Sequence, residues 1–347
     1  MDRRKRLAFT LAGVGFGAVA VAAAQGTKPK AKPAGFHLVR THPIADAQIP
    51  SGLAVDGAAG RIYVARSVDV LVMDTATGKE AATIPCPESR QGIALAPELK
   101  LGFASHSATG SLTGFDLASG SAIFDAKTGE TPTQPSFDAS LKRVATVDQK
   151  GCDVTVIDAT NGNVVGSVPL GAPPGEAAGD GKGRLYVADP QKNEVIAVDL
   201  KKLEIAKRWS IAPLRLGHGI AVDPSTRRLF LGTDDEQLAV TSVESWKTVT
   251  TVVLRREVHA CVFDPGTQTI LATTGDRSLS VVHEDSADKY TVVEHAVTED
   301  DVKLLALDGK THEVALVAWK LGPKEQRGEI YVQPIVEGSL KILIYGK

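Results

Sequence analysis

The sequence predicts an all-β fold, a seven-bladed β-propeller of four-stranded antiparallel blades around a central channel. A strand–turn–strand unit returns seven times, at intervals of 40 to 44 residues. Its strand segments are rich in Val, Ile and Thr and lack the 3.6-residue apolar period of a helical solenoid. Four short strands in a unit of about forty residues is the period of a propeller blade.

The units align on the residue that ends the first strand of each. These residues are Asp56, Ala96, Asp138, Asp180, Asp223, Asp264 and Asp308. After a turn comes a second strand, predicted at residues 62–65, 102–105, 144–147, 185–188, 229–232, 270–273 and 314–317. Third strands are clearest at 70–74, 112–116, 154–158 and 195–199. Each of these ends in Asp, and Asp suits the turn into a fourth strand because its carboxylate can cap the backbone.

One blade cannot bury both of its faces alone, so blades pack face to face and the ring must close. Residues 36–45 stand where a fourth strand would precede the first unit, and residues 340–345 stand where one would follow the last. Either segment could complete the seventh blade. We expect the two to lie side by side or to compete for that edge, and the sequence leaves open which is the inner one.

The N-terminus has the pattern of an export signal. Four basic residues, Arg3 to Arg6, precede an apolar run to Ala24, and Ala22-Ala23-Ala24 offers a cleavage site. We therefore predict a signal peptide at 1–24, a flexible Lys/Pro tether at 25–35, a single propeller domain at 36–347, and a periplasmic or extracellular location without a membrane span after cleavage. The alternative is an uncleaved anchor, since an 18-residue apolar run can span a bilayer.

Charge and cysteine content limit the function classes. Removal of residues 1–24 leaves 35 basic and 40 acidic residues, a formal charge of −5, which argues against a globally basic nucleic-acid binder. The three cysteines, Cys86, Cys152 and Cys261, lie at wide spacings in different units, so free thiols are favoured over a disulfide. We expect a monomer.

Several motifs place the chain near a known family. Gly-Ile-Ala-Val-Asp-Pro at 219–224, Tyr-Val-Ala at 63–65 and 186–188, and Val-Thr-Val-Ile-Asp at 154–158 resemble the YVTN-repeat β-propellers, the YncE-like family of secreted proteins, from about residue 36 to the C-terminus. The resemblance implies the fold and a binding or surface role, with a wider similarity to the propeller subunit of quinoprotein amine dehydrogenases. Arg66 and Asp189 stand where that family commonly has Asn.

Candidate site residues follow from propeller geometry. The innermost strands all start at one face, so residues five before the aligned position should ring the channel mouth, and the loop after each second strand opens on the same face. The ring comprises Ser51, Gln91, Thr133, Gly175, His218, His259 and Lys303. The candidate ligand-binding residues at this mouth are Arg66, Gln91, His106, Asp148, Asp189, His218, His259, Lys303 and Trp319.

His218 and His259 occupy matching positions in neighbouring units. They could ligate a metal together with Asp148 or Asp189, or act as acid and base, but water-bonded rim histidines are the more common case. The sequence has no phosphate loop, nucleophile elbow or calcium loop, and we predict no cofactor, metal site or catalytic residue.

These observations favour an exported binding or scaffold protein that presents a polar funnel to a small molecule, peptide or envelope partner. One alternative is a metal-assisted hydrolase or lactonase at the same mouth, by analogy with other propellers. Another is single-stranded nucleic-acid binding, as suggested for some relatives, through a basic patch of Lys201, Lys202, Lys207 and Arg208. The partner itself cannot be named from the sequence.

Overall fold

A computed structural model describes residues 35–45, 48–86, 92–298, 302–327 and 330–347. The predicted signal peptide and all of the predicted tether except Gly35 lie outside these residues. Within the described part of the chain, no helix combines the length and apolar character needed to cross a membrane.

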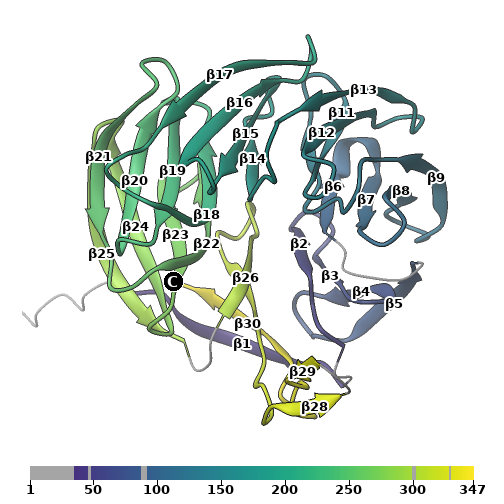
Figure 1. The fold of residues 1–347 in the computed structure, drawn as a ribbon. Helices are drawn as coiled ribbons and strands as arrows, with labels where there is room; N and C mark the ends of the chain where they lie inside the picture. The colour runs from purple at the N-terminus through teal and green to yellow at the C-terminus, as the bar shows by residue number, and fades with distance from the viewer. Residues whose placement is uncertain (1–34, 46–47, 87–91, 299–301, 328–329) are drawn as a thin grey trace, which may run out of the picture. The chain divides into compact units, whose positions relative to one another are not determined.

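Seven four-stranded antiparallel blades form a ring, which confirms the predicted fold (Figure 1). Six blades are built from consecutive strands. Blade 1 has β2 (Gly52–Asp56), β3 (Arg61–Ala65), β4 (Asp69–Asp74) and β5 (Glu80–Pro85), and blade 2 has β6 (Ile93–Ala96), β7 (Leu101–His106), β8 (Ser111–Asp116) and β9 (Ala122–Lys127). Blade 3 has β10 (Ser136–Asp138), β11 (Arg143–Asp148), β12 (Asp153–Asp158) and β13 (Val164–Pro169).

The next three blades repeat the plan. Blade 4 has β14 (Ala177–Gly179), β15 (Arg184–Asp189), β16 (Glu194–Asp199) and β17 (Glu204–Ser210), and blade 5 has β18 (Leu216–Asp223), β19 (Arg228–Thr233), β20 (Gln237–Ser242) and β21 (Lys247–Val253). Blade 6 has β22 (Val258–Asp264), β23 (Thr269–Thr274), β24 (Ser278–Ser286) and β25 (Lys289–Val297).

Blade 7 joins the two ends of the chain. Its strands run in the order β26 (Val302–Leu307), β27 (Val314–Ala318), β30 (Lys341–Gly346) and β1 (His37–Pro43), from the inside outwards. The expected side-by-side placement of the terminal segments is therefore confirmed, with the C-terminal strand third and the N-terminal strand outermost. The first strands of neighbouring blades contact one another all the way round, and the contact of β26 with β2 completes the ring.

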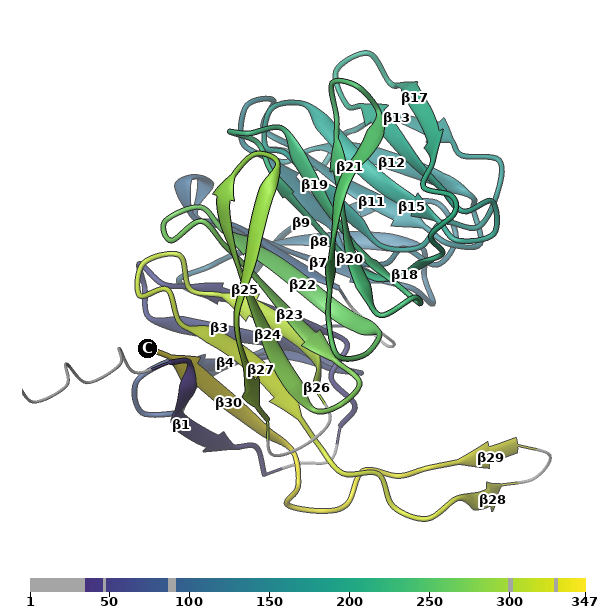
Figure 2. The same cartoon turned by 90° about the vertical axis from the view of Figure 1, so that its left-hand side faces the viewer.

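The core consists of apolar layers between blades, because the middle strands of each blade are buried on both faces. One layer, for example, joins Ile62 and Val64 of β3 to Val317 and Ile344 of blade 7. Between β27 and β30, a small hairpin of β28 (Glu325–Arg327) and β29 (Ile330–Val332) projects from blade 7 (Figure 2).

The turns between first and second strands use the same Asp capping that the sequence predicts for the turns into the fourth strands. In blade 5 the carboxylate of Asp223 accepts hydrogen bonds from the backbone N–H and hydroxyl groups of Ser225 and Thr226, which fixes the turn into β19. Blade 2 has Ala96 at this position, and there a short 3₁₀ helix, η1 (Pro97–Leu99), makes the turn instead.

Candidate functional site

The ring positions lie where propeller geometry places them, at or just before the start of the first strands. His218 is in β18, His259 is in β22, and Ser51, Thr133 and Gly175 directly precede their strands or stand a few residues before them. Gln91 lies outside the described residues. Lys303 is part of β26, but its side chain lies outside the description.

At this mouth, a glutamate of blade 4 contacts two residues of blade 5. The His218 ring nitrogen Nδ1 lies 3.2 Å from Oε1 of Glu176, and the backbone N–H of Gly219 donates to Oε2 of the same carboxylate at 2.7 Å. Glu176 thus binds two successive residues of the neighbouring blade. The imidazole itself remains 74% exposed.

Glu176 was not among the residues predicted from the sequence. It follows Gly175, the ring position of blade 4, which has no side chain to contribute. The sequence signal that could have found Glu176 is a glycine at a ring position followed directly by a glutamate.

His259 is placed in the same way on blade 6 but is less accessible. Its side chain is 20% exposed, and Nε2 lies 4.0 Å from the carboxylate of Glu257, which precedes β22. Each histidine therefore has a glutamate nearby. The two pairs differ because Glu176 comes from the neighbouring blade, whereas Glu257 comes from the same chain segment as His259.

The candidate residues at or just after the ends of the second strands are buried, whereas the lining of an open funnel would be exposed. Arg66, His106, Asp148 and Asp189 are each no more than 4% exposed. They end or follow their strands at the mouth side, but their side chains turn into their own blades. Their role in ligand binding therefore remains a prediction.

Two of these buried residues hold the hairpin between the second and third strands. Arg66 Nε donates to Asp69 Oδ1 at 2.6 Å within blade 1. In blade 4, Asp189 Oδ1 accepts from the Lys192 backbone at 3.1 Å, and its other oxygen lies 4.0 Å from Arg208 Nη1. These contacts explain why charged residues are retained at buried positions, since each charge has an opposite partner or a donor.

His106 belongs to a buried chain of polar side chains inside blade 2. Its Nε2 lies 2.8 Å from the hydroxyl of Thr113, which donates at 2.5 Å to the carboxylate of Asp125. The three residues come from β7, β8 and β9, so the chain crosses the blade from its second to its fourth strand. Its direction is away from the channel.

Asp148 is the most perturbed carboxyl among the candidates. It accepts hydrogen bonds from the hydroxyls of Thr146 and Thr155, at 2.9 and 2.6 Å, and from the Gly129 backbone at 3.2 Å. Burial nevertheless raises its pKa to about 6, and the neighbouring charge of Asp153 adds to the effect. Burial also raises the pKa of Asp153, its cross-strand partner, and a hydrogen bond with Asp148 opposes that shift.

Trp319, Cys86 and Cys261 behave as packing residues. Trp319 is half-buried and packs against the apolar layer between blades 7 and 1. All three cysteines are free, as expected. Burial raises the pKa of the Cys86 thiol to about 11 and raises that of Cys261 further, so neither thiol is activated as a nucleophile.

Among the candidates whose side chains the structure describes, no metal centre is formed. Across the described ranges, no three His, Cys, Asp or Glu side chains gather closely enough to hold a metal ion. The structure brings His218 together with Glu176, whereas Asp148 and Asp189 are bound inside blades 3 and 4.

Comparison with known proteins adds a family to this geometry. The family profile of the outer membrane protein assembly factor BamB, PQQ_2, matches residues 19–206, just over half of the chain. The chain belongs to this family. The match supports a β-propeller family, while the more specific YVTN-repeat resemblance stays a prediction.

Solved structures agree on the fold alone. A chain in a crystal structure of the mitotic checkpoint complex superposes with a TM-score of 0.72 over 96% of this chain and 98% of that one, at 13% sequence identity. At that identity the likeness carries no functional information. A search of curated proteins gives no match.

Proposed function

We propose that the protein is an exported binding scaffold of the cell envelope that holds a partner protein of outer-membrane assembly at its inner-strand mouth. The observation that carries the proposal is the match to the BamB family, whose name describes an outer membrane protein assembly factor. The basic and apolar N-terminus supports export, since it has the pattern of a cleavable signal.

The mouth is the favoured binding face because it presents an exposed polar contact from a rigid frame. His218 stands 74% exposed on a first strand, held by Glu176 from the neighbouring blade. Side chains that are already positioned lose little entropy on binding, which favours recognition of a folded partner or peptide. The proposal concerns binding alone.

Export is tested by following the N-terminus. We expect the full-length chain, produced in a Gram-negative host, to accumulate in the periplasm with an intact mass that begins at Gln25. A protein recovered with its first 24 residues in the membrane fraction would instead support the uncleaved anchor.

Partner binding is tested by a photo-crosslinking amino acid at position 218, with position 310 as the matched control. Lys310 lies in the exposed turn between β26 and β27, at the opposite end of the blades. We expect an adduct from position 218 with an envelope protein of outer-membrane assembly, weakened by His259→Ala, and none from position 310. An adduct from position 310 alone would place the binding face at the other end.

A further inference from the structure

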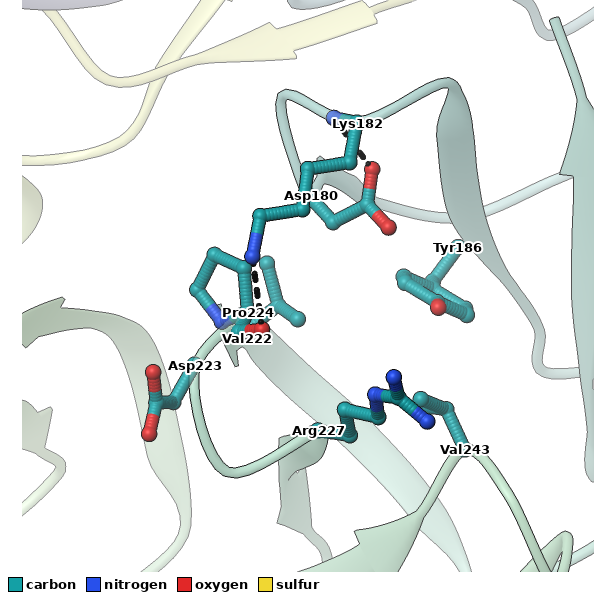
Figure 3. A pocket seen from close by; sticks show the side chains of 8 residues that line it. All are labelled: Asp180, Lys182, Tyr186, Val222, Asp223, Pro224, Arg227 and Val243. Carbon is teal, nitrogen blue, oxygen red and sulfur yellow. Dashed lines mark hydrogen bonds between the residues drawn. The ribbon is translucent and has the colours of Figure 1, made fainter.

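A pocket of about 190 Å³ opens between blades 4 and 5, at the end of the strands opposite to His218. Its lining residues are Asp180, Lys182, Tyr186, Val222, Asp223, Pro224, Arg227 and Val243 (Figure 3). They come from the turn after β14, from β15, from β18 and its following turn, and from the turn after β20. Two blades therefore build the pocket jointly.

The charged groups of the lining are of both signs. Lys182 donates through Nζ to the Pro224 carbonyl at 3.0 Å, which places the ammonium at the rim and leaves it two further donors. The Arg227 guanidinium faces the open space from the other blade (Figure 3). Arg227 also forms an ion pair with Glu244. That ion pair is exposed on both partners and therefore exchanges readily with a ligand carboxylate.

Asp180 provides the negative charge. One of its oxygens, Oδ1, accepts from the backbone N–H groups of Lys182 and Arg184, at 2.8 and 3.0 Å, so the carboxylate is fixed by its own turn. The other oxygen faces the pocket (Figure 3). Asp223 also lines the pocket, but its carboxylate points away and is taken up by Ser225 and Thr226.

The remaining wall is apolar with one hydroxyl. Val222, Pro224 and Val243 form the apolar part, and the phenol of Tyr186 lies beside Arg227. Burial, together with the nearby Asp180 charge, raises the pKa of Tyr186 to about 12, so the hydroxyl is a donor at neutral pH.

The same interblade position elsewhere in the ring serves as an internal comparison. Between blades 7 and 1, the residues that correspond to Tyr186, Arg227 and Val243 are Ala315, Gly60 and Thr75. The pocket there is only about 10 Å³, although Lys310 stands where blade 4 has Lys182. The larger volume and the paired charges are therefore not shared by blades 7 and 1, so they do not follow from the repeat alone.

We propose that the pocket between blades 4 and 5 binds a small zwitterion, a free α-amino acid with a short aliphatic side chain. Its carboxylate lies between Lys182 and Arg227, its ammonium faces the free oxygen of Asp180, and its side chain packs on Val222, Pro224 and Val243. A ligand with only one of the two charges leaves the opposite charge of the pocket unmatched.

The proposal is tested on the mature protein by calorimetric titration with three probes of similar shape. L-leucine carries both charges, N-acetyl-L-leucine lacks the ammonium, and 3-methylbutylamine lacks the carboxylate. We expect leucine to bind in the millimolar range or tighter and each single-charge probe to bind about tenfold more weakly or worse. Saturable binding of all three with equal affinity, or no binding of leucine, would overturn the proposal.

Two pocket variants and two matched controls locate the site. Arg227→Gln and Lys182→Gln should each weaken leucine binding about tenfold, since each removes a charge-assisted contact. Lys310→Gln and Lys100→Gln, at the corresponding positions of other blades, should leave it unchanged. His218→Ala should also leave it unchanged, which separates this site from the mouth. Thermal unfolding of every variant verifies the fold, and equal losses in the controls would contradict the assignment.

Discussion

At the scale of single residues, Asp148 shows how burial and hydrogen bonding compete. Three donors favour its charged form, yet burial outweighs them and raises its pKa to about 6. The raised pKa means that the folded state binds the proton more tightly than the unfolded state does. Below the unfolded pKa near 4, Asp148 is protonated in both states and does not lower the free energy of unfolding. As the pH rises from about 4 to about 6, Asp148 lowers the free energy of unfolding progressively, and above about 6 the loss is complete.

We predict that Asp148→Asn raises the free energy of unfolding at pH 7 by about 1–3 kcal/mol, because the neutral amide removes the cost of a buried charge. As the pH rises from 4 to 6, the free energy of unfolding should fall less steeply in the variant than in the parent protein. Urea unfolding across this pH range measures both effects. A variant with an unchanged pH slope would show that Asp148 titrates normally.

Asp116→Asn is the control of opposite sign. Hydrogen bonds from the backbone and hydroxyl of Ser119 hold the pKa of Asp116 below its usual range. Such a group contributes stability above the unfolded pKa and loses it as the pH falls through the folded pKa. We expect its replacement to lower stability at neutral pH and to reduce the loss on acidification, as measured by the same unfolding series.

At the scale of the strand, close packing within blades restricts particular glycines. A Cβ on Gly232 in β19 would stand 1.9 Å from the His218 carbonyl oxygen and 2.7 Å from Val258, so backbone would have to move. We predict that Gly232→Ala costs about 2–4 kcal/mol of folding free energy. Gly309→Ala, where a Cβ meets nothing within 4 Å, should be neutral or slightly stabilising. Equal thermal shifts for the two variants would contradict this account.

The strand pattern was predictable because each blade repeats the same chemistry. The second strands and the Asp-capped turns were located from the sequence, since a buried middle strand needs an apolar run and a tight turn needs a cap. The order of the terminal strands was not predictable. Residues 342–345 form an unbroken apolar run, whereas residues 37–43 mix apolar and polar side chains, and the pairing of β30 with both β27 and β1 shows that β30 is the inner of the two strands.

The candidate site was predictable only in part, because burial depends on neighbours that the repeat does not specify. Position along the strand placed His218 and His259 at the mouth. The same logic placed Asp148 there, but the loop around Gly129 folds over it and its hydroxyl partners take up the carboxylate. The pocket between blades 4 and 5 was missed because it joins residues from two units, and no single unit contains the pattern.

At the scale of the whole molecule, β1 closes the ring by pairing with β30 of the last unit. Phe36 and Ile44, which flank this strand, are buried in separate apolar layers. We predict that a chain starting at residue 44 unfolds about 10 °C or more below one starting at residue 35, since it loses both a strand edge and apolar burial. A chain starting at residue 25 should match the one starting at 35. Calorimetry of the three chains gives the test, and equal midpoints would mean that β1 adds nothing to closure.

Because the two ends of the chain share blade 7, the position of new chain ends in a circular permutant should affect the stability of the ring. Gly346 pairs with His37, so a short turn can join the natural ends, and new ends can then be cut elsewhere. New ends in the turn between β16 and β17 leave blade 4 shared by both termini, as blade 7 is now. New ends between β13 and β14 leave every blade continuous, so that no backbone ladder joins blades 3 and 4, which are then held by packing and by side-chain hydrogen bonds such as that from the Gly183 N–H to Asp138.

We expect the second permutant to lose amide-exchange protection first in blades 3 and 4, and to unfold at a lower temperature than the first. The physical reason is that backbone hydrogen bonds between β16 and β17 would hold the first permutant's ends, whereas the second has no such ladder across its gap. Equal protection at the two cuts would show that packing between blades, without a shared strand, is sufficient to keep this ring closed.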